Sequence, residues 1–352
     1  MKKYDLGPDL VRSAALLLVI LTHSVVLSGA YSYPGTLRIG WIVTMLAFYL
    51  SHSCVPLFLI LSGYLCREKL PERSYYSGVF RTLVPYVLVS VIVLADGRRA
   101  DHALKLTTMI YRLLSFRAGA YDWYVEMYLG LFLLIPFINL LYARLSSRQR
   151  NVLLGCLIIM TLLPDVLTSF GTENVRADIL PDYFKNCYPV TYYLTGVWLR
   201  DHREIITPRH GAILLGLGWL LPTALCISRS VRSGTYRGGG TLSTFNCLTV
   251  GICAVGLFIL LVQIQTCRIP GVRTIVREIA NASLASYLFS SLLDHYLYVE
   301  LTLPFLAMTL IIFVCSGLVG AMISRLSAPL IRPCVRCYDA VSLKLQKKIP
   351  AV

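Results

Sequence analysis

Long apolar runs recur along the whole chain, and they constrain its fold more than any other feature. A helix needs roughly 20 apolar residues to cross about 30 Å of hydrocarbon, because each residue advances it by about 1.5 Å. Runs of this kind begin near Leu10, Ile39, Val79, Trp123, Val152, Tyr188, Ala212, Leu242, Ala282 and Leu303. The sequence therefore predicts an all-α polytopic integral membrane bundle of about ten transmembrane helices, with residues 1–352 as one membrane-embedded domain.

The composition agrees with a lipid environment. Hydrophobic residues make up 56% of the chain and charged residues only 14%, whereas soluble domains carry about 25% charged residues. Most of the 11 cysteines lie inside apolar runs, where a thiol behaves as a small hydrophobe. Cys334 and Cys337 form one C-x-x-C without two further ligands at suitable spacing, so we expect no metal site.

The net charge of +15 is explained by how the chain is oriented in the membrane. Most Lys and Arg residues occupy short gaps between apolar runs, a pattern typical of membrane orientation and headgroup contact, not of nucleic-acid binding. A cytoplasmic N-terminus places most of them in cytoplasmic segments, with the loop 96–121 as the main exception. Both termini are therefore predicted in the cytoplasm, the protein in the plasma membrane, and residues 329–352 as a basic tail without a fold of its own.

Two segments leave their membrane position open. The run from Tyr188 to Leu199 is short for a span. The segment 101–116 is amphipathic and either lies in the membrane interface or enters the protein without crossing.

The first apolar run carries three ionisable residues, Asp9, Arg12 and His23. Such residues are costly within a membrane, so each is a candidate for function. At about 100° per residue, all three project from one face of a helix. Arg12 suits the phosphates of an acyl carrier, Asp9 can brace its guanidinium, and His23 can act as a general base. The alternative is a flanking arginine and a hydrogen-bonded core histidine.

Ordered motifs resemble the membrane-bound acyltransferase 3 family over nearly the whole chain. The first is Asp9-Leu10-Val11-Arg12 with His23, an R-x10-H spacing. The later ones are Val55–Phe58 with Leu61–Tyr64, Arg81 with Pro85-Tyr86, Asp122–Glu126 with Pro136, Tyr192–Gly196 and Ser283–Tyr287. Two positions depart from the pattern: Gly78 stands where a basic residue is frequent, and Ser290 where a histidine is common.

The resemblance implies transfer of an acetyl or other short acyl group. The donor would be cytoplasmic acyl-CoA, used as a substrate with no permanently bound cofactor. The acceptor would be a hydroxyl of a cell-envelope carbohydrate, such as a polysaccharide or lipid-linked glycan. The expected partners are these two substrates and membrane lipids, and no nucleic acid.

Further site candidates come from the same motifs. Glu126 is an acidic residue just inside an apolar run and is a candidate for orienting the acceptor. The other predicted substrate contacts are Arg81, Ser62, Gly63, Trp123, Tyr124 and Tyr287. Most of these residues also have a structural explanation. Arg81 can be a basic residue that sets membrane orientation, and Trp123 and Tyr124 can anchor a helix at the membrane interface. Ser62 and Gly63 can form a contact between helices.

A transporter or flippase for a glycan or small solute is the competing hypothesis. A buried charged stripe in a multi-span bundle would also suit transport. The sequence, however, shows no inverted repeat and no paired Gly/Pro-broken helices in corresponding halves. Binding of coenzyme A distinguishes the two classes.

Overall fold

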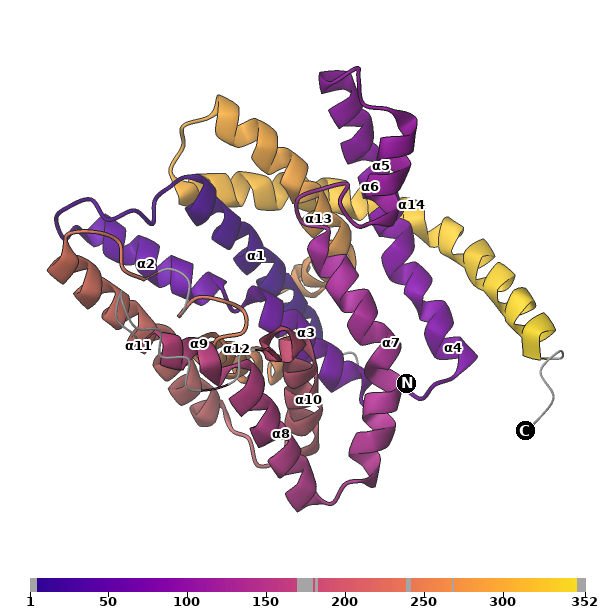
Figure 1. Ribbon diagram of the computed structural model, residues 1–352, viewed down its shortest axis with the longest axis horizontal. Coiled ribbons are helices and arrows are strands. Elements are labelled where there is room, and N and C mark those ends of the chain that lie inside the picture. The colour runs from indigo at the N-terminus through magenta and orange to yellow at the C-terminus, as the bar shows by residue number, and fades with distance from the viewer. Residues whose placement is uncertain (1–4, 170–179, 181–182, 239–241, 268, 347–352) are drawn as a thin grey trace. The chain divides into compact units, whose positions relative to one another are not determined.

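The computed structural model describes residues 5–169, 180, 183–238, 242–267 and 269–346, and regular secondary structure within them is helical (Figure 1). The first helices are α1 (Gly7–Leu27), α2 (Ile39–Ser51), α3 (Cys54–Cys66), α4 (Arg73–Tyr76), the 3-10 helix η1 (Ser77–Val79), α5 (Phe80–Ala100), α6 (Leu106–Leu114) and α7 (Trp123–Arg144). The remaining ones are α8 (Ser147–Thr161), α9 (Leu163–Thr168), the 3-10 helix η2 (Lys185–Cys187), α10 (Tyr188–Asp201), α11 (Pro208–Ser233), α12 (Leu248–Val262), α13 (Val272–Glu300) and α14 (Phe305–Gln346).

Six helical stretches among the described residues are long and apolar enough to cross a membrane. They confirm the membrane-protein class, and each coincides with a predicted run. They are Gly7–Leu27, Ile39–Cys66, Arg73–Ala100, Trp123–Arg144, Pro208–Ser233 and Phe305–Lys344.

The other predicted runs also form helices, but these are less suited to crossing. α8 and α12 have 15 residues each and α10 has 14, which is shorter than the roughly 20 that a span needs. α13 has 29 residues, but its first turns carry Arg273, Arg277 and Glu278. The total of about ten spans and the cytoplasmic location of the termini therefore stay predictions.

The second apolar stretch is interrupted at His52 and Ser53, between α2 and α3. Side chains at the break satisfy carbonyl groups of the preceding turn. The Ser51 and Ser53 hydroxyls donate to Phe48 O at 2.8 Å and Leu50 O at 2.7 Å, and His52 Nδ1 lies 2.7 Å from Phe48 O. Short polar side chains thus compensate for the interrupted helix in an apolar environment.

The chain divides into two compact units, and neither is continuous in sequence. The first unit comprises Met1–Arg67, Leu145–Ala280 and Tyr298–Ile311, and so contains α1–α3 and α8–α12. The second unit comprises Glu68–Arg144, Asn281–Leu297 and Ile312–Val352, and so contains α4–α7 with most of α13 and α14.

Glycines set the helix contacts of the first unit. A Cβ on Gly63 of α3 would overlap the carbonyl oxygen of Tyr193, and a Cβ on Gly196 of α10 would overlap that of Ile60. Gly218 and Gly256 bring the backbones of α11 and α12 together in the same manner. Small residues at such contacts let membrane helices approach closely.

Gly63→Ala is therefore expected to destabilise the protein. The methyl group must displace α10 backbone, and overpacking of this kind costs about 1–3 kcal/mol. Thermal denaturation of the detergent-solubilised protein should show a clearly lower midpoint. Gly216→Ala in α11 is the matched control, because no atom from outside its own stretch of helix lies within 4 Å of its added Cβ. Equal midpoints for the two variants would contradict this packing.

The first unit has two chemically distinct ends, which lie at opposite ends of α12. Near the start of α12 is an aromatic and apolar core that includes Trp41, Phe48 and Tyr49, with Tyr31 and Tyr236 packed against it. The indole of Trp41 donates to Tyr31 O at 3.1 Å, and the Tyr49 hydroxyl donates to Gly238 O at 2.8 Å. Charged residues gather at the other end, where α12 finishes.

The amphipathic segment 101–116 of the second unit contains α6, a helix of nine residues. Its side chains Leu106, Tyr111 and Leu114 are between 60% and 72% exposed. The Tyr86 hydroxyl donates to Leu113 O at 2.7 Å and attaches α6 to α5. A short helix with exposed apolar side chains favours a position in the membrane interface over entry into the protein.

Candidate functional site

The predicted ionic residues at the start of α1 lie together. Arg12 Nη1 is 3.7 Å from Asp9 Oδ1, with 30% of the arginine and 16% of the aspartate side chain exposed. The N-terminus of α1 is held against the end of α12, since Leu6 N donates to Gln265 O at 3.4 Å and Gly7 lies against the Val262 backbone. Arg12 therefore lies near the charged end of the first unit.

His23 lies about 16 Å further along α1, on the face that Arg12 shares. Between them on this face are Leu16 and Val19, which are 0% and 4% exposed. A substrate that contacts both Arg12 and His23 must therefore pass beside this buried pair and not along an open stripe of α1.

His23 is half-buried and has a histidine neighbour. It lies within electrostatic range of His52 at the break between α2 and α3. The His52 ring packs on Phe48 at a centroid distance of 4.3 Å. One imidazole from α1 and one from the break between α2 and α3 thus lie in one region of the first unit, so His52 is the natural comparison for any role of His23.

An ion-pair network closes the charged end of the first unit. Asp201, at the end of α10, pairs with Arg67 after α3 and lies 3.7 Å from Arg150 of α8. Arg200 donates to Tyr64 O at 2.8 Å, and its guanidinium lies 5.9 Å from the centroid of the Tyr64 ring. The ends of α3, α8 and α10 are therefore fixed together.

Sequence reasoning missed this network, because it treated the arginines only as markers of topology. The available signal was Asp201, an acidic residue directly after an apolar run and among basic residues. The residue that pairs with it could not be chosen from spacing alone, since Arg67 and Arg150 lie far from it in sequence.

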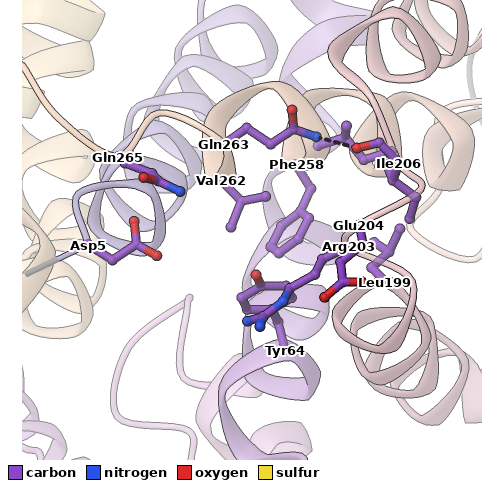
Figure 2. Close-up of a pocket in the computed structure, with 11 residues that line it drawn as sticks. Asp5, Tyr64, Leu199, Arg203, Glu204, Ile206, Phe258, Val262, Gln263 and Gln265 are labelled. Atoms are coloured by element: carbon purple, nitrogen blue, oxygen red, sulfur yellow. Dashed lines mark hydrogen bonds between the residues drawn. The ribbon is translucent and has the colours of Figure 1, made fainter. Parts of the chain in front are cut away.

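A pocket of about 450 Å³ opens beside this network (Figure 2). Tyr64 and Phe258 meet edge to face at a centroid distance of 5.4 Å, and the Gln263 amide donates to Ile206 O at 3.1 Å. Arg12 and His23 are not among the lining residues, which are Asp5, Tyr64, Leu199, Arg203, Glu204, Ile206, Phe258, Ile259, Val262, Gln263 and Gln265.

The charges of the pocket restrict what it can bind. Its lining carries the carboxylates of Asp5 and Glu204 and the guanidinium of Arg203. Two carboxylates beside one cation disfavour a polyphosphate, which needs an excess of cationic donors. The aromatic pair and the glutamine amides instead suit a neutral group with hydrogen-bonding edges.

The motif Ser62-Gly63-Tyr64 has three structural roles. Ser62 is half-buried and donates back to Phe58 O at 2.9 Å within α3. Gly63 forms the close contact with α10, and Tyr64 lines the pocket. The structure thus accounts for Gly63 by helix packing and adds Tyr64 to the candidate site.

In the second unit, two predicted substrate residues lie together. Tyr124 and Tyr287 meet edge to face at 5.8 Å, and Tyr287 stacks on Tyr121 at 5.6 Å. The Tyr287 hydroxyl donates to Tyr121 O at 3.0 Å, and the Tyr121 hydroxyl donates to Asp294. Asp294 thus adds a carboxylate to an aromatic cluster.

Other predicted residues of the second unit are more accessible. Glu126 and Arg81 are exposed, and Trp123 is 36% exposed at the start of α7. Asp122 is buried in the turn before α7, where its Oδ2 accepts from Gly119 N at 2.8 Å. Burial raises the pKa of the Asp122 carboxyl above its usual value.

The arrangement supplies organic acid–base and anion-binding groups. Within the described residues, no group of three His, Cys, Asp or Glu side chains is placed to hold a metal ion. The first unit offers Arg12 and Asp9 near its charged end and two histidines further along. The second unit offers the tyrosines around Asp294.

A helical chain with six apolar stretches of spanning length defines a polytopic membrane protein. Residues 5–325 match the acyltransferase domain of the acyltransferase 3 family. The chain therefore belongs to this family and is a membrane acyltransferase. Comparisons with curated proteins and with solved structures give no match.

Proposed function

We propose that the protein transfers an acyl group, acetyl in the simplest case, from cytoplasmic acyl-CoA to a hydroxyl of a cell-envelope carbohydrate. The observation that carries this proposal is the family match over residues 5–325. It includes Arg12 and His23 of α1, the residues whose chemistry suits a phosphate-bearing donor and proton removal.

In the proposed reaction, the acceptor hydroxyl attacks the thioester carbon directly. His23, or a water that it orients, removes the hydroxyl proton while the new C–O bond forms. The C–S bond then breaks, and the departing thiolate takes up the proton that was removed from the hydroxyl, so that the free thiol leaves and the base is regenerated. The products are an O-acyl carbohydrate and coenzyme A.

Arg12 is proposed to hold the donor phosphates, because a guanidinium matches their geometry with two donors. Asp9, 3.7 Å away, orients that guanidinium. The pocket of Figure 2 opens at the same end of the first unit. Its charges suit the uncharged part of the carrier better than the phosphates, so we assign the phosphates to Arg12.

Two of the other predicted contacts suit the acceptor. Tyr124 and Tyr287 provide aromatic faces with hydroxyl groups, which suit stacking and hydrogen bonding to a sugar. Glu126 is proposed to orient the acceptor, and Ser62 and Trp123 stay proposed substrate contacts. Arg81 is proposed as a second cation for the carrier.

Donor binding and acyl transfer test the function together. The purified protein in detergent should bind radiolabelled coenzyme A saturably. When it is reconstituted with envelope glycan and labelled acetyl-CoA, an ester-linked label should accumulate on the glycan. Glycan movement across vesicles without any donor binding or ester formation would contradict acyl transfer and favour a transporter.

A further inference from the structure

The last helix is much longer than a membrane span. α14 has 42 residues, which corresponds to about 63 Å of helix, whereas the hydrocarbon core is about 30 Å thick. Its final part, residues 324–346, follows the apolar portion and is termed the tail helix below. It contains Pro329 and Pro333, the residue type at which helices most often change direction.

The tail helix belongs to the second unit and contacts other helices of that unit at two places. Near its start, Ser324 donates to Asn281 O of α13 at 3.4 Å. Further on, Asp339 pairs with Arg73 of α4 at 3.3 Å, and Tyr338 meets Phe80 edge to face at 6.2 Å. In Figure 1, the tail helix is the yellow end of α14. The Asp339–Arg73 ion pair joins it to the start of α4.

Both attachment points lie where a helix changes from charged to apolar. Asn281 follows Arg277 and Glu278, where the apolar part of α13 begins. Phe80 directly precedes Arg81, where the apolar part of α5 begins. The helix between Ser324 and Asp339 is about 22 Å long, which is less than the thickness of the core. The two boundaries therefore belong to the same side of the membrane.

The exposed face of the tail helix is apolar at its centre. Leu326, Leu330 and Val341 are 62%, 45% and 51% exposed, and at about 100° per residue they fall within one narrow stripe, together with the exposed Cys337. The exposed Arg325, Arg332 and Arg336 follow one edge of this stripe. A helix with an apolar face and a basic flank matches the surface of a membrane.

The charge balance selects an anionic surface. Asp339 is the only acidic residue of the tail helix, and it is paired with Arg73. Arg332, Arg336 and Lys344 thus confer a positive charge on a segment beside the membrane boundary. Basic residues at this position are attracted by anionic headgroups.

We propose that the tail helix binds the anionic lipid headgroups of the leaflet that it borders, with its apolar stripe inserted beneath them. This interaction is independent of acyl transfer, because none of the proposed catalytic residues belongs to this segment. Headgroup binding would fix the end of α14 at the membrane surface. Through the pair of Asp339 and Arg73, it would also fix the start of the α4–α5 stretch there.

Quenching by brominated lipid tests the proposal on the full-length protein. Leu330→Trp and Val341→Trp are each reconstituted into vesicles of brominated phosphatidylcholine with 30% or no phosphatidylglycerol, and the emission of the wild-type protein is subtracted. In vesicles that contain phosphatidylglycerol, quenching should lower the emission of the introduced tryptophan at least twofold. Arg332→Gln combined with Arg336→Gln should remove most of that quenching, whereas the matched control Arg144→Gln with Arg148→Gln should not.

Three results would overturn the proposal. An unquenched tryptophan at both positions would place the stripe in water. Equal quenching with and without phosphatidylglycerol would show apolar contact without headgroup recognition. Equal effects of the two double substitutions would show a general charge effect. Acyl-transfer activity plays no part in this measurement, so failure here leaves the proposed function unaffected.

Discussion

Replacement of His23 by alanine is expected to abolish measurable acyl transfer while the protein still folds. A general base contributes about a hundredfold to ten-thousandfold to the rate, and alanine removes the imidazole that would accept the hydroxyl proton. The measurement is the transfer of labelled acetyl to envelope glycan in membranes. Thermal stability of the same preparation verifies that the helix contacts are intact.

His52→Gln is the matched control for His23, because the two histidines are neighbours and His52 makes a backbone contact with Phe48 O. Glutamine keeps a polar group at the helix break, so activity should fall less than about tenfold, below the effect of a lost general base. If His52→Gln abolishes transfer and His23→Ala does not, the base is His52 and the role given to His23 is wrong.

Arg12→Ala is expected to raise the KM for the acyl donor by about tenfold to a hundredfold, with a smaller change in kcat. A hydrogen bond to a charged group is worth about 1.5–3 kcal/mol, and each 1.4 kcal/mol is a factor of ten. Arg12→Lys should recover only part of this loss, because an ammonium lacks the paired donors that match a phosphate. Steady-state kinetics with varied donor and varied acceptor separate the two effects.

Asp9→Asn is the companion variant, since it keeps the shape of the side chain that braces Arg12. It should raise the donor KM less than Arg12→Ala does. An unchanged donor KM with a raised acceptor KM in Arg12→Ala would reverse the assignment and place the acceptor at this end of α1.

Much of the architecture follows from local pattern, because an apolar run of sufficient length must be helical in lipid. The runs beginning at Leu10 and Trp123 became α1 and α7, and Asp9 and Arg12 pair as their spacing predicts. The break at His52 was not predicted, since the run through it is apolar on both sides and the interruption depends on hydroxyl groups that satisfy carbonyls.

Contacts between distant segments were harder to predict. The pairing of Asp201 with Arg67, and the approach of Gly63 to Tyr193, depend on how α3 and α10 pack. Periodicity places a residue on a helix face but does not identify the neighbouring helix. For the same reason, the buried Leu16 and Val19 between Arg12 and His23 became evident only from the packed structure.

The most direct test of the account is a density map of the full-length protein with a non-hydrolysable acyl-CoA analogue bound. The account predicts carrier phosphates against Arg12 and the acyl carbon within reach of His23, with the arm of the donor passing beside Leu16 and Val19. Donor density away from α1, or an acyl group separated from His23 by packed side chains, would contradict it.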